Sequence, residues 1–180
     1  MSHGASSRGS HERQRAPYVA VVGPEAATSS EVETAQRLGR LLAQQHCTVI
    51  CGGLGGVMEA VCRGAKSQGG TTVGLLPGSS RAQGNAFLSV ALPTGLGELR
   101  NGLVVRSADA VIVVGGSWGT LSEMALAVRT NKPTIVINGW DIGVPDQPRN
   151  PQLRMATSVE DAIDALLWMV AHEAVADDAI

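Results

Sequence analysis

The sequence predicts an α/β fold, in which an open parallel β-sheet carries helices on both faces. Short apolar runs alternate along the chain with segments whose apolar residues recur at helical spacing. The runs contain almost no polar residues, which is typical of strands that are buried on both sides. Several runs end in glycine-rich turns, where a backbone can approach a ligand closely. Together these features indicate a Rossmann-like sheet, whose ligand lies outside the carboxyl ends of its strands.

The expected strands are short and rich in β-branched residues. They cover Tyr18–Val22, Cys47–Cys51, Thr71–Leu76, a weaker Phe87–Leu92, Val111–Val114 and Pro133–Ile137. Polar residues that follow the third strand, up to Asn85, predict a mobile surface loop. The segment Gly139–Met155 is rich in Pro, Asp and Asn, so we expect a second loop there.

The expected helices have one apolar side and capping residues near their ends. They run from Thr28–Ser30 to about Gln45, from about Val57 to Gln68, from Gly97 to about Ser107, through Leu121–Val128, and onward from a cap near Thr157 or Ser158. In the third helix, Leu99, Leu103 and Val104 are expected to face the core, and Arg100 and Asn101 to point elsewhere. The apolar side of the fourth helix is expected to hold Leu121, Met124, Ala125 and Val128.

Length and composition fit one domain over residues 17–180, preceded by a disordered Ser- and Gly-rich tail over residues 1–16. A net charge of -2 and 3% aromatic residues argue against a nucleic-acid partner. No apolar run approaches the roughly 20 residues that span a bilayer, so no membrane association is expected. The tail lacks the apolar core of a signal peptide, and the three cysteines lack a zinc spacing. We therefore expect a cytoplasmic protein without a metal site.

Three glycine turns follow expected strands and should meet at one edge of the sheet. They contain Gly23, Gly52–Gly56 and Gly115–Thr120. In the third turn, glycines expose backbone N–H groups just before the N-terminus of a helix, and Thr120 adds a hydroxyl group. Such N–H groups and the helix dipole favour an anion. The sequence therefore predicts a phosphate site at this turn.

Common nucleotide fingerprints and cofactor anchors are missing. No G-x-G-x-x-G segment follows the first strand, and Met58 stands where the last glycine of such a segment would follow Gly53-x-Gly55. No glycine run ends in Lys-Ser or Lys-Thr, so a P-loop is absent. Neither Lys66 nor Lys132 lies at the carboxyl end of a strand, which argues against a pyridoxal phosphate enzyme. We expect no resident cofactor.

Two segments resemble the LOG (lonely guy) and lysine-decarboxylase-like superfamily, which includes molybdenum cofactor carrier proteins. Residues 52–60, GGLGGVMEA, resemble its G-G-x-x-G-[LV]-M segment, and residues 115–123, GGSWGTLSE, resemble its P-G-G-x-G-T-x-x-E signature. Arg100 lies where the family carries an Arg-Lys pair. The resemblance covers roughly Tyr18 to Asn138.

This resemblance implies that the chain binds a phosphorylated small molecule, either an AMP-like nucleotide or a pterin. LOG enzymes hydrolyse the N-glycosidic bond of nucleoside 5′-monophosphates and release the base and ribose 5-phosphate. The resemblance therefore implies first of all such a phosphoribohydrolase, with Arg100 and Glu123 as its catalytic residues. It implies a ligand site made of Gly23, Gly52, Gly53, Gly55, Gly56, Val57, Met58, Asn101, Gly115, Gly116, Ser117, Gly119 and Thr120. It also implies a homodimer or a higher homo-oligomer.

Several residues are compatible with other interpretations. Val114 stands in place of the signature's proline, and Asn101 in place of the lysine after Arg100. These departures and the short core also fit a non-catalytic nucleotide or molybdenum cofactor carrier. Thr120 and Glu123 have the spacing of a capping box, so Glu123 could cap its own helix. Gly52–Gly56 could form an ordinary tight turn.

Overall fold

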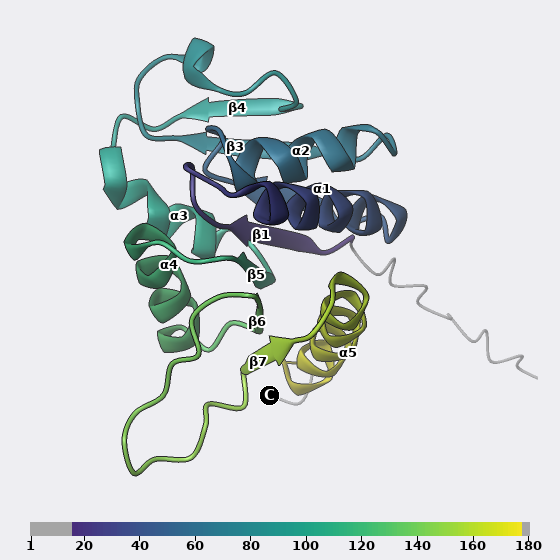
Figure 1. Ribbon diagram of the computed structural model, residues 1–180, viewed down its shortest axis with the longest axis vertical. Helices are drawn as coiled ribbons and strands as arrows, with labels where there is room; N and C mark the ends of the chain where they lie inside the picture. Colours follow the sequence, from purple (N-terminus) through teal and green to yellow (C-terminus); the bar gives the residue numbers. More distant parts are fainter. Residues whose placement is uncertain (1–15, 178–180) are drawn as a thin grey trace, which may run out of the picture.

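The computed structural model describes residues 16–177 and confirms the predicted α/β class (Figure 1). Its seven strands, all within the described residues, form a parallel sheet in the order β4-β3-β2-β1-β5-β6-β7. They are β1 (Tyr18–Val22), β2 (Thr48–Cys51), β3 (Thr72–Leu76), β4 (Val90–Pro93), β5 (Ala110–Val114), β6 (Thr134–Ile137) and β7 (Leu153–Ala156). The helices are α1 (Ser29–Gln44), α2 (Val57–Lys66), α3 (Asn101–Arg106), α4 (Trp118–Arg129) and α5 (Val159–Asp177), with short 3₁₀ turns η1 (Arg81–Gln83) and η2 (Gly97–Arg100).

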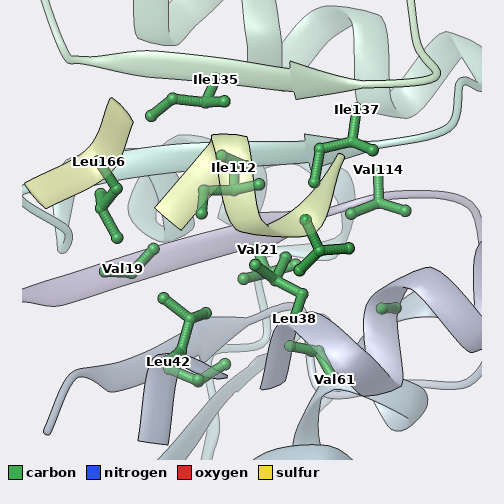
Figure 2. Close-up of a cluster of buried hydrophobic side chains, with 14 of the residues drawn as sticks. Val19, Val21, Leu38, Leu42, Val61, Ile112, Val114, Ile135, Ile137 and Leu166 are labelled. Atoms are coloured by element: carbon green, nitrogen blue, oxygen red, sulfur yellow. The ribbon is translucent and has the colours of Figure 1, made fainter. Parts of the chain in front are cut away.

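The helices form a layer on each face of the sheet, as predicted. Alternate residues of a strand point to opposite faces. On β1, Val19 and Val21 join the cluster that packs against α1, α2 and α5, whereas Ala20 and Val22 join the cluster under α3 and α4. Figure 2 shows the first cluster, in which Leu38 and Leu166 cover side chains of the central strands. Burial on both faces explains why the central strands contain so few polar residues.

The order of the strands reverses beside β1, and this reversal positions the site. The chain runs outward from β1 through β2 and β3 to β4, and then returns to the other side of β1 with β5. Val22 of β1 pairs with Val113 of β5, so the two carboxyl ends lie together. In open α/β sheets, ligands bind at such a switch point.

The expectation of an uninterrupted loop from Gly139 to Met155 is wrong, because Leu153–Ala156 forms β7. This strand lies at the edge of the sheet and pairs with β6, from Thr134↔Leu153 onward. An edge strand is only partly covered, and Arg154 is exposed. The segment therefore lacks the continuous apolar run by which the inner strands were recognised.

The expected orientation of the third helix is wrong for Leu99, Leu103 and Arg100, whereas Val104 is buried as expected. Residues 97–107 divide into η2 and α3, and Leu99 and Leu103 are exposed while Arg100, Val104 and Val105 are buried. Arg100 and Val104 are four residues apart, just as the two leucines are, so spacing alone could not decide between the two faces. A buried carboxylate opposite Arg100 favours the observed face.

The buried side of α4 differs by about one position from the expected one. Thr120, Glu123, Met124 and Ala127 are buried, whereas Ala125 is exposed. Two of the buried residues are polar. A prediction based on the spacing of apolar residues therefore could not identify the buried side of this helix. The loop before Asn85 is attached to the turn after β2, since the Asn85 amide donates to the Gly53 and Leu54 carbonyl oxygens at 3.2 and 3.0 Å.

The expected tail lies outside the described residues, apart from Ala16. In the part of the chain that the structure describes, no helix has both the length and the apolar character needed to cross a bilayer.

Candidate functional site

A cavity of about 110 Å³ lies at the switch point of the sheet. Its walls come from the end of β1, the residue after β2, the start of α2, the junction of η2 with α3, and the first turns of α4. The lining residues are Val21, Val22, Gly23, Gly52, Met58, Arg100, Asn101, Ser117, Gly119, Thr120 and Glu123. Nine of these were expected as site residues from the sequence. Val21 and Val22 were not, although both immediately precede the first glycine turn.

Arg100 reaches the cavity because Gly52 has no side chain. A Cβ atom placed on Gly52 would lie 2.6 Å from Nη2 of Arg100 and 2.8 Å from its Cζ. A side chain at position 52 would overlap the guanidinium group of Arg100, so this position requires glycine. The sequence motif did not suggest this packing role. Gly23 has a comparable packing role, since a Cβ there would lie 2.6 Å from both the Val114 carbonyl oxygen and Cγ1 of Val57.

Arg100 and Glu123 form a buried, loosely coupled ion pair. Their side chains are 10% and 9% exposed, and Nη1 of Arg100 lies 3.7 Å from Oε1 of Glu123. Nη1 also donates a hydrogen bond to Oδ1 of Asn101. Nε of Arg100 is buried and has no hydrogen-bond partner among the described residues. A buried N–H group without a partner is costly, so this donor indicates a position where a ligand oxygen would be stabilised.

Burial controls the protonation of Glu123. Removal from water raises its pKa from the ordinary value of 4.5 to about 7, although the positive charge of Arg100 acts in the opposite direction. The carboxyl group therefore exchanges its proton near neutral pH. A group with such a pKa can serve as a general acid or base, and in its neutral form it repels an incoming anion less.

The N-terminus of α4 is capped by Ser117. Its hydroxyl oxygen accepts a hydrogen bond from the Thr120 backbone N–H at 3.2 Å and lies 2.9 Å from the Thr120 hydroxyl oxygen. The interpretation of Thr120 and Glu123 as a capping box is therefore wrong, because Thr120 is the third residue of the helix. Glu123 is available to face Arg100 across the cavity.

The glycine turn before α4 is held in place by close contacts. Gly115 has φ +67°, and a Cβ there would meet the Glu31 carboxylate at 1.9 Å. A Cβ on Gly116 would lie 2.8 Å from Nε1 of Trp140. Both glycines shape the turn but do not line the cavity, unlike Ser117, Gly119 and Thr120.

The second glycine turn lies next to the cavity, but few of its residues line it. Gly53 and Gly56 have φ +77° and +61°, conformations that favour glycine, and Gly56 is the N-cap residue of α2. Gly53, Gly55, Gly56 and Val57 do not belong to the lining, whereas Met58 does. Most of this segment is therefore compatible with the alternative of an ordinary tight turn. Only Gly52 and Met58 contribute to the lining of the cavity.

The chain is similar to known proteins over most of its length. A family model described as the SLOG cluster4 family matches residues 16–165. The chain is 40% identical over 130 residues to an uncharacterised protein of Archaeoglobus fulgidus, a match that spans 69% of this chain and 85% of that protein. The expected LOG-like superfamily is thereby confirmed.

Two solved structures match nearly over their whole length. The molybdenum cofactor binding protein of the phototrophic bacterium Rippkaea orientalis is 34% identical, with a TM-score of 0.79, and the match covers 87% of this chain and 99% of that one. The molybdenum cofactor carrier protein of Chlamydomonas reinhardtii is 30% identical, with a TM-score of 0.76 and coverage of 86% and 99%.

Proposed function

The chain belongs to the SLOG cluster4 family, and on this basis we propose that it binds the molybdenum cofactor, a phosphorylated pterin, and carries it without cleaving a bond. The observation that carries this proposal is the buried guanidinium group of Arg100, which lines the same cavity as the N-terminus of α4 and whose Nε has no hydrogen-bond partner in the described part of the chain. Fixed positive charge and helix N–H groups both attract phosphate. The similarity to proteins that are described as binding or carrying this cofactor supports the choice of ligand.

The partners of Arg100 favour a binding role over hydrolysis. Asn101 accepts a hydrogen bond from Arg100, at the position where the LOG resemblance calls for a second cation. Nη1 of the guanidinium group thus faces an amide and a carboxyl group, and Nε keeps a hydrogen that no described residue accepts. A single fixed cation suits reversible binding of one phosphate group.

A reconstitution experiment tests the proposed ligand. Cofactor released anaerobically from a molybdoenzyme is mixed with the protein, passed over a desalting column, and measured in the protein fraction as a fluorescent pterin after oxidation. We expect retention that approaches one cofactor per chain. Arg100→Met should weaken it about 10- to 150-fold, since hydrogen bonds to a charged group contribute about 1.5–3 kcal/mol. The exposed Arg106, the last residue of α3, supplies the control variant Arg106→Met. Failure of the unchanged protein to retain the cofactor contradicts the proposal.

Hydrolysis of a nucleoside 5′-monophosphate is the second candidate, and the pKa of Glu123 favours it. A carboxyl group with a pKa of about 7 could orient water or stabilise the positive charge that develops on a sugar when its glycosidic bond breaks. A panel of nucleoside 5′-monophosphates is incubated with the protein, and released base is measured by chromatography. Release that Glu123→Gln abolishes and the exposed control Glu33→Gln preserves would establish this function instead of the carrier role.

A further inference from the structure

Two tryptophan side chains form an exposed aromatic pair beside the cavity. Trp118 is the first residue of α4, and Trp140 follows β6. Their ring centroids are 5.5 Å apart, with 34° between the ring planes. Trp118 remains 78% exposed and Trp140 37% exposed. A large apolar ring that packs against one neighbour and leaves most of its surface in water is a candidate contact for a ligand.

The pair adjoins the site through its two supporting segments. Ser117 and Gly119, which flank Trp118 in the chain, both line the cavity. Trp140 lies directly on the glycine turn, because a Cβ on Gly116 would come within 2.8 Å of its Nε1. The preceding residue, Gly139, packs equally closely on the Gly115 carbonyl oxygen, at 2.5 Å from a Cβ position. The segment after β6 thus holds an aromatic ring against the outer side of the turn that carries the expected phosphate site.

The size of the cavity leaves part of the ligand outside it. Pockets that enclose a drug-sized ligand have volumes of about 300–1,000 Å³. The cavity at Arg100 has only about 110 Å³, which suits a phosphate group and the atoms next to it. The planar ring system of a nucleotide or pterin must then lie beyond the rim. Trp118 supplies a flat apolar surface there.

On the premise that a phosphorylated ligand occupies the cavity as proposed above, we propose that Trp118 and Trp140 form the stacking site for its planar heterocycle. Trp140 supports the ring of Trp118, and the open face of Trp118 stacks on the heterocycle. Stacking is tolerant of ring identity because every such ring has a π-face. The tryptophan pair therefore selects planar phosphorylated compounds over sugar phosphates, and the phosphate site anchors both.

Calorimetric titration with three probes tests this assignment. Ribose 5-phosphate contains the phosphate group without a planar ring. Formycin A 5′-monophosphate contains a purine-like base on a C–C bond, so hydrolysis of an N-glycosidic bond cannot consume it. The phosphate ester of 6-hydroxymethylpterin represents a pterin. The stronger binder of the last two shows which kind of heterocycle the site prefers.

Trp118→Ala should weaken binding of the preferred planar probe about 5- to 150-fold, as expected for the loss of one base–aromatic stack of about 1–3 kcal/mol. Binding of ribose 5-phosphate should change less than twofold, and Trp118→Phe should restore most of the affinity. Trp168, an exposed tryptophan of α5 that stacks on His172, gives the control variant Trp168→Ala, which should bind all probes like the unchanged protein.

The outcomes separate this inference from the proposed function. A change of less than fivefold for both planar probes in Trp118→Ala overturns the stacking site and leaves the phosphate site intact. An equal loss for all three probes also overturns it, since Trp118 would then shape the glycine turn. If the unchanged protein binds none of the probes, the proposed phosphorylated ligand itself is wrong.

Discussion

At the scale of single residues, the site depends on a charge pair that is almost removed from water. Arg100 and Glu123 are each about one-tenth exposed, but their closest N–O distance of 3.7 Å is long for an ion pair with direct hydrogen bonds. The attraction therefore offsets only part of the cost of burying the carboxylate, and the pKa of Glu123 rises to about 7. Near neutral pH, the net charge of the Arg100–Glu123 pair therefore depends on whether Glu123 carries its proton.

This proton makes stability depend on pH. Unfolded Glu123 has a pKa near 4.5 and folded Glu123 a pKa of about 7, so the folded state holds the proton more tightly. The resulting stabilisation is fully present below pH 4.5 and is lost as the pH rises through 7. We expect the free energy of unfolding of the unchanged protein to fall, relative to that of Glu123→Gln, by up to roughly 3 kcal/mol between pH 4.5 and 8.

Urea unfolding at several pH values measures this difference, with the exposed Glu33→Gln as the control. Parallel pH curves for the unchanged protein and Glu123→Gln would contradict the raised pKa. The control curve should follow that of the unchanged protein, because Glu33 is exposed on α1.

The sequence motifs predicted both Arg100 and Glu123 as site residues, but only the structure shows which groups they contact. Helical spacing favoured Leu99 and Leu103 as the inward residues and directed Arg100 elsewhere. The buried position of Arg100 depends on Gly52, about fifty positions earlier in the chain, and on Glu123 in another helix. Contacts between residues so far apart leave no periodic signal in a single sequence.

At the scale of elements, α1 and α2 pack unusually closely through two glycines. A Cβ on Gly39 would lie 2.1 Å from the Val61 carbonyl oxygen, and one on Gly64 would lie 2.0 Å from the Gln36 carbonyl oxygen. Backbone atoms of the two helices are therefore in direct contact. This contact fixes α2, whose first turn supplies Met58 to the cavity.

Gly64→Ala tests the closeness of this packing. The added methyl group overlaps backbone atoms that cannot rotate away, so the helices must separate. We expect a loss of about 1–3 kcal/mol in the free energy of unfolding, measured with urea. Gly102→Ala in α3 is the matched control, since its Cβ would meet only Cδ2 of Leu126 at 3.7 Å. Alanine should leave stability unchanged or raise it there, by up to about 1 kcal/mol. Similar effects at both glycines would contradict the close contact.

The elements that the sequence predicted well are those in which burial is uniform. The inner strands lie between two helical layers, so their side chains are apolar almost throughout. The structure differs from the prediction where burial is uneven. β7 lies at an edge, η2 exposes Leu99, and α4 buries Thr120 and Glu123 at the site. In α4, buried polar residues thus replace part of the apolar pattern that identifies a helix face.

At the scale of the whole molecule, one stretch of chain exposes many large apolar side chains. Val90 and Leu92 of β4, Leu96 before η2, Leu99 within it and Leu103 of α3 are all more than two-fifths exposed, and Leu99 is 82% exposed. Burying them would stabilise an assembled state by the hydrophobic effect. The resemblance to LOG-like proteins implies a homo-oligomer, and this stretch is where we expect a second copy to bind.

Light scattering coupled to size exclusion should therefore give a mass at least twice that of one 18.6 kDa chain. Leu99→Glu should produce the monomer, because a charge in an apolar interface loses its hydration without gaining a partner. Val144, an exposed valine after β6, gives the control variant Val144→Glu, which should keep the mass of the unchanged protein. A monomeric unchanged protein, or an unaltered mass for Leu99→Glu, would contradict this interface. Since Leu99 directly precedes Arg100 in η2, such an interface would also hold the cation of the site in place.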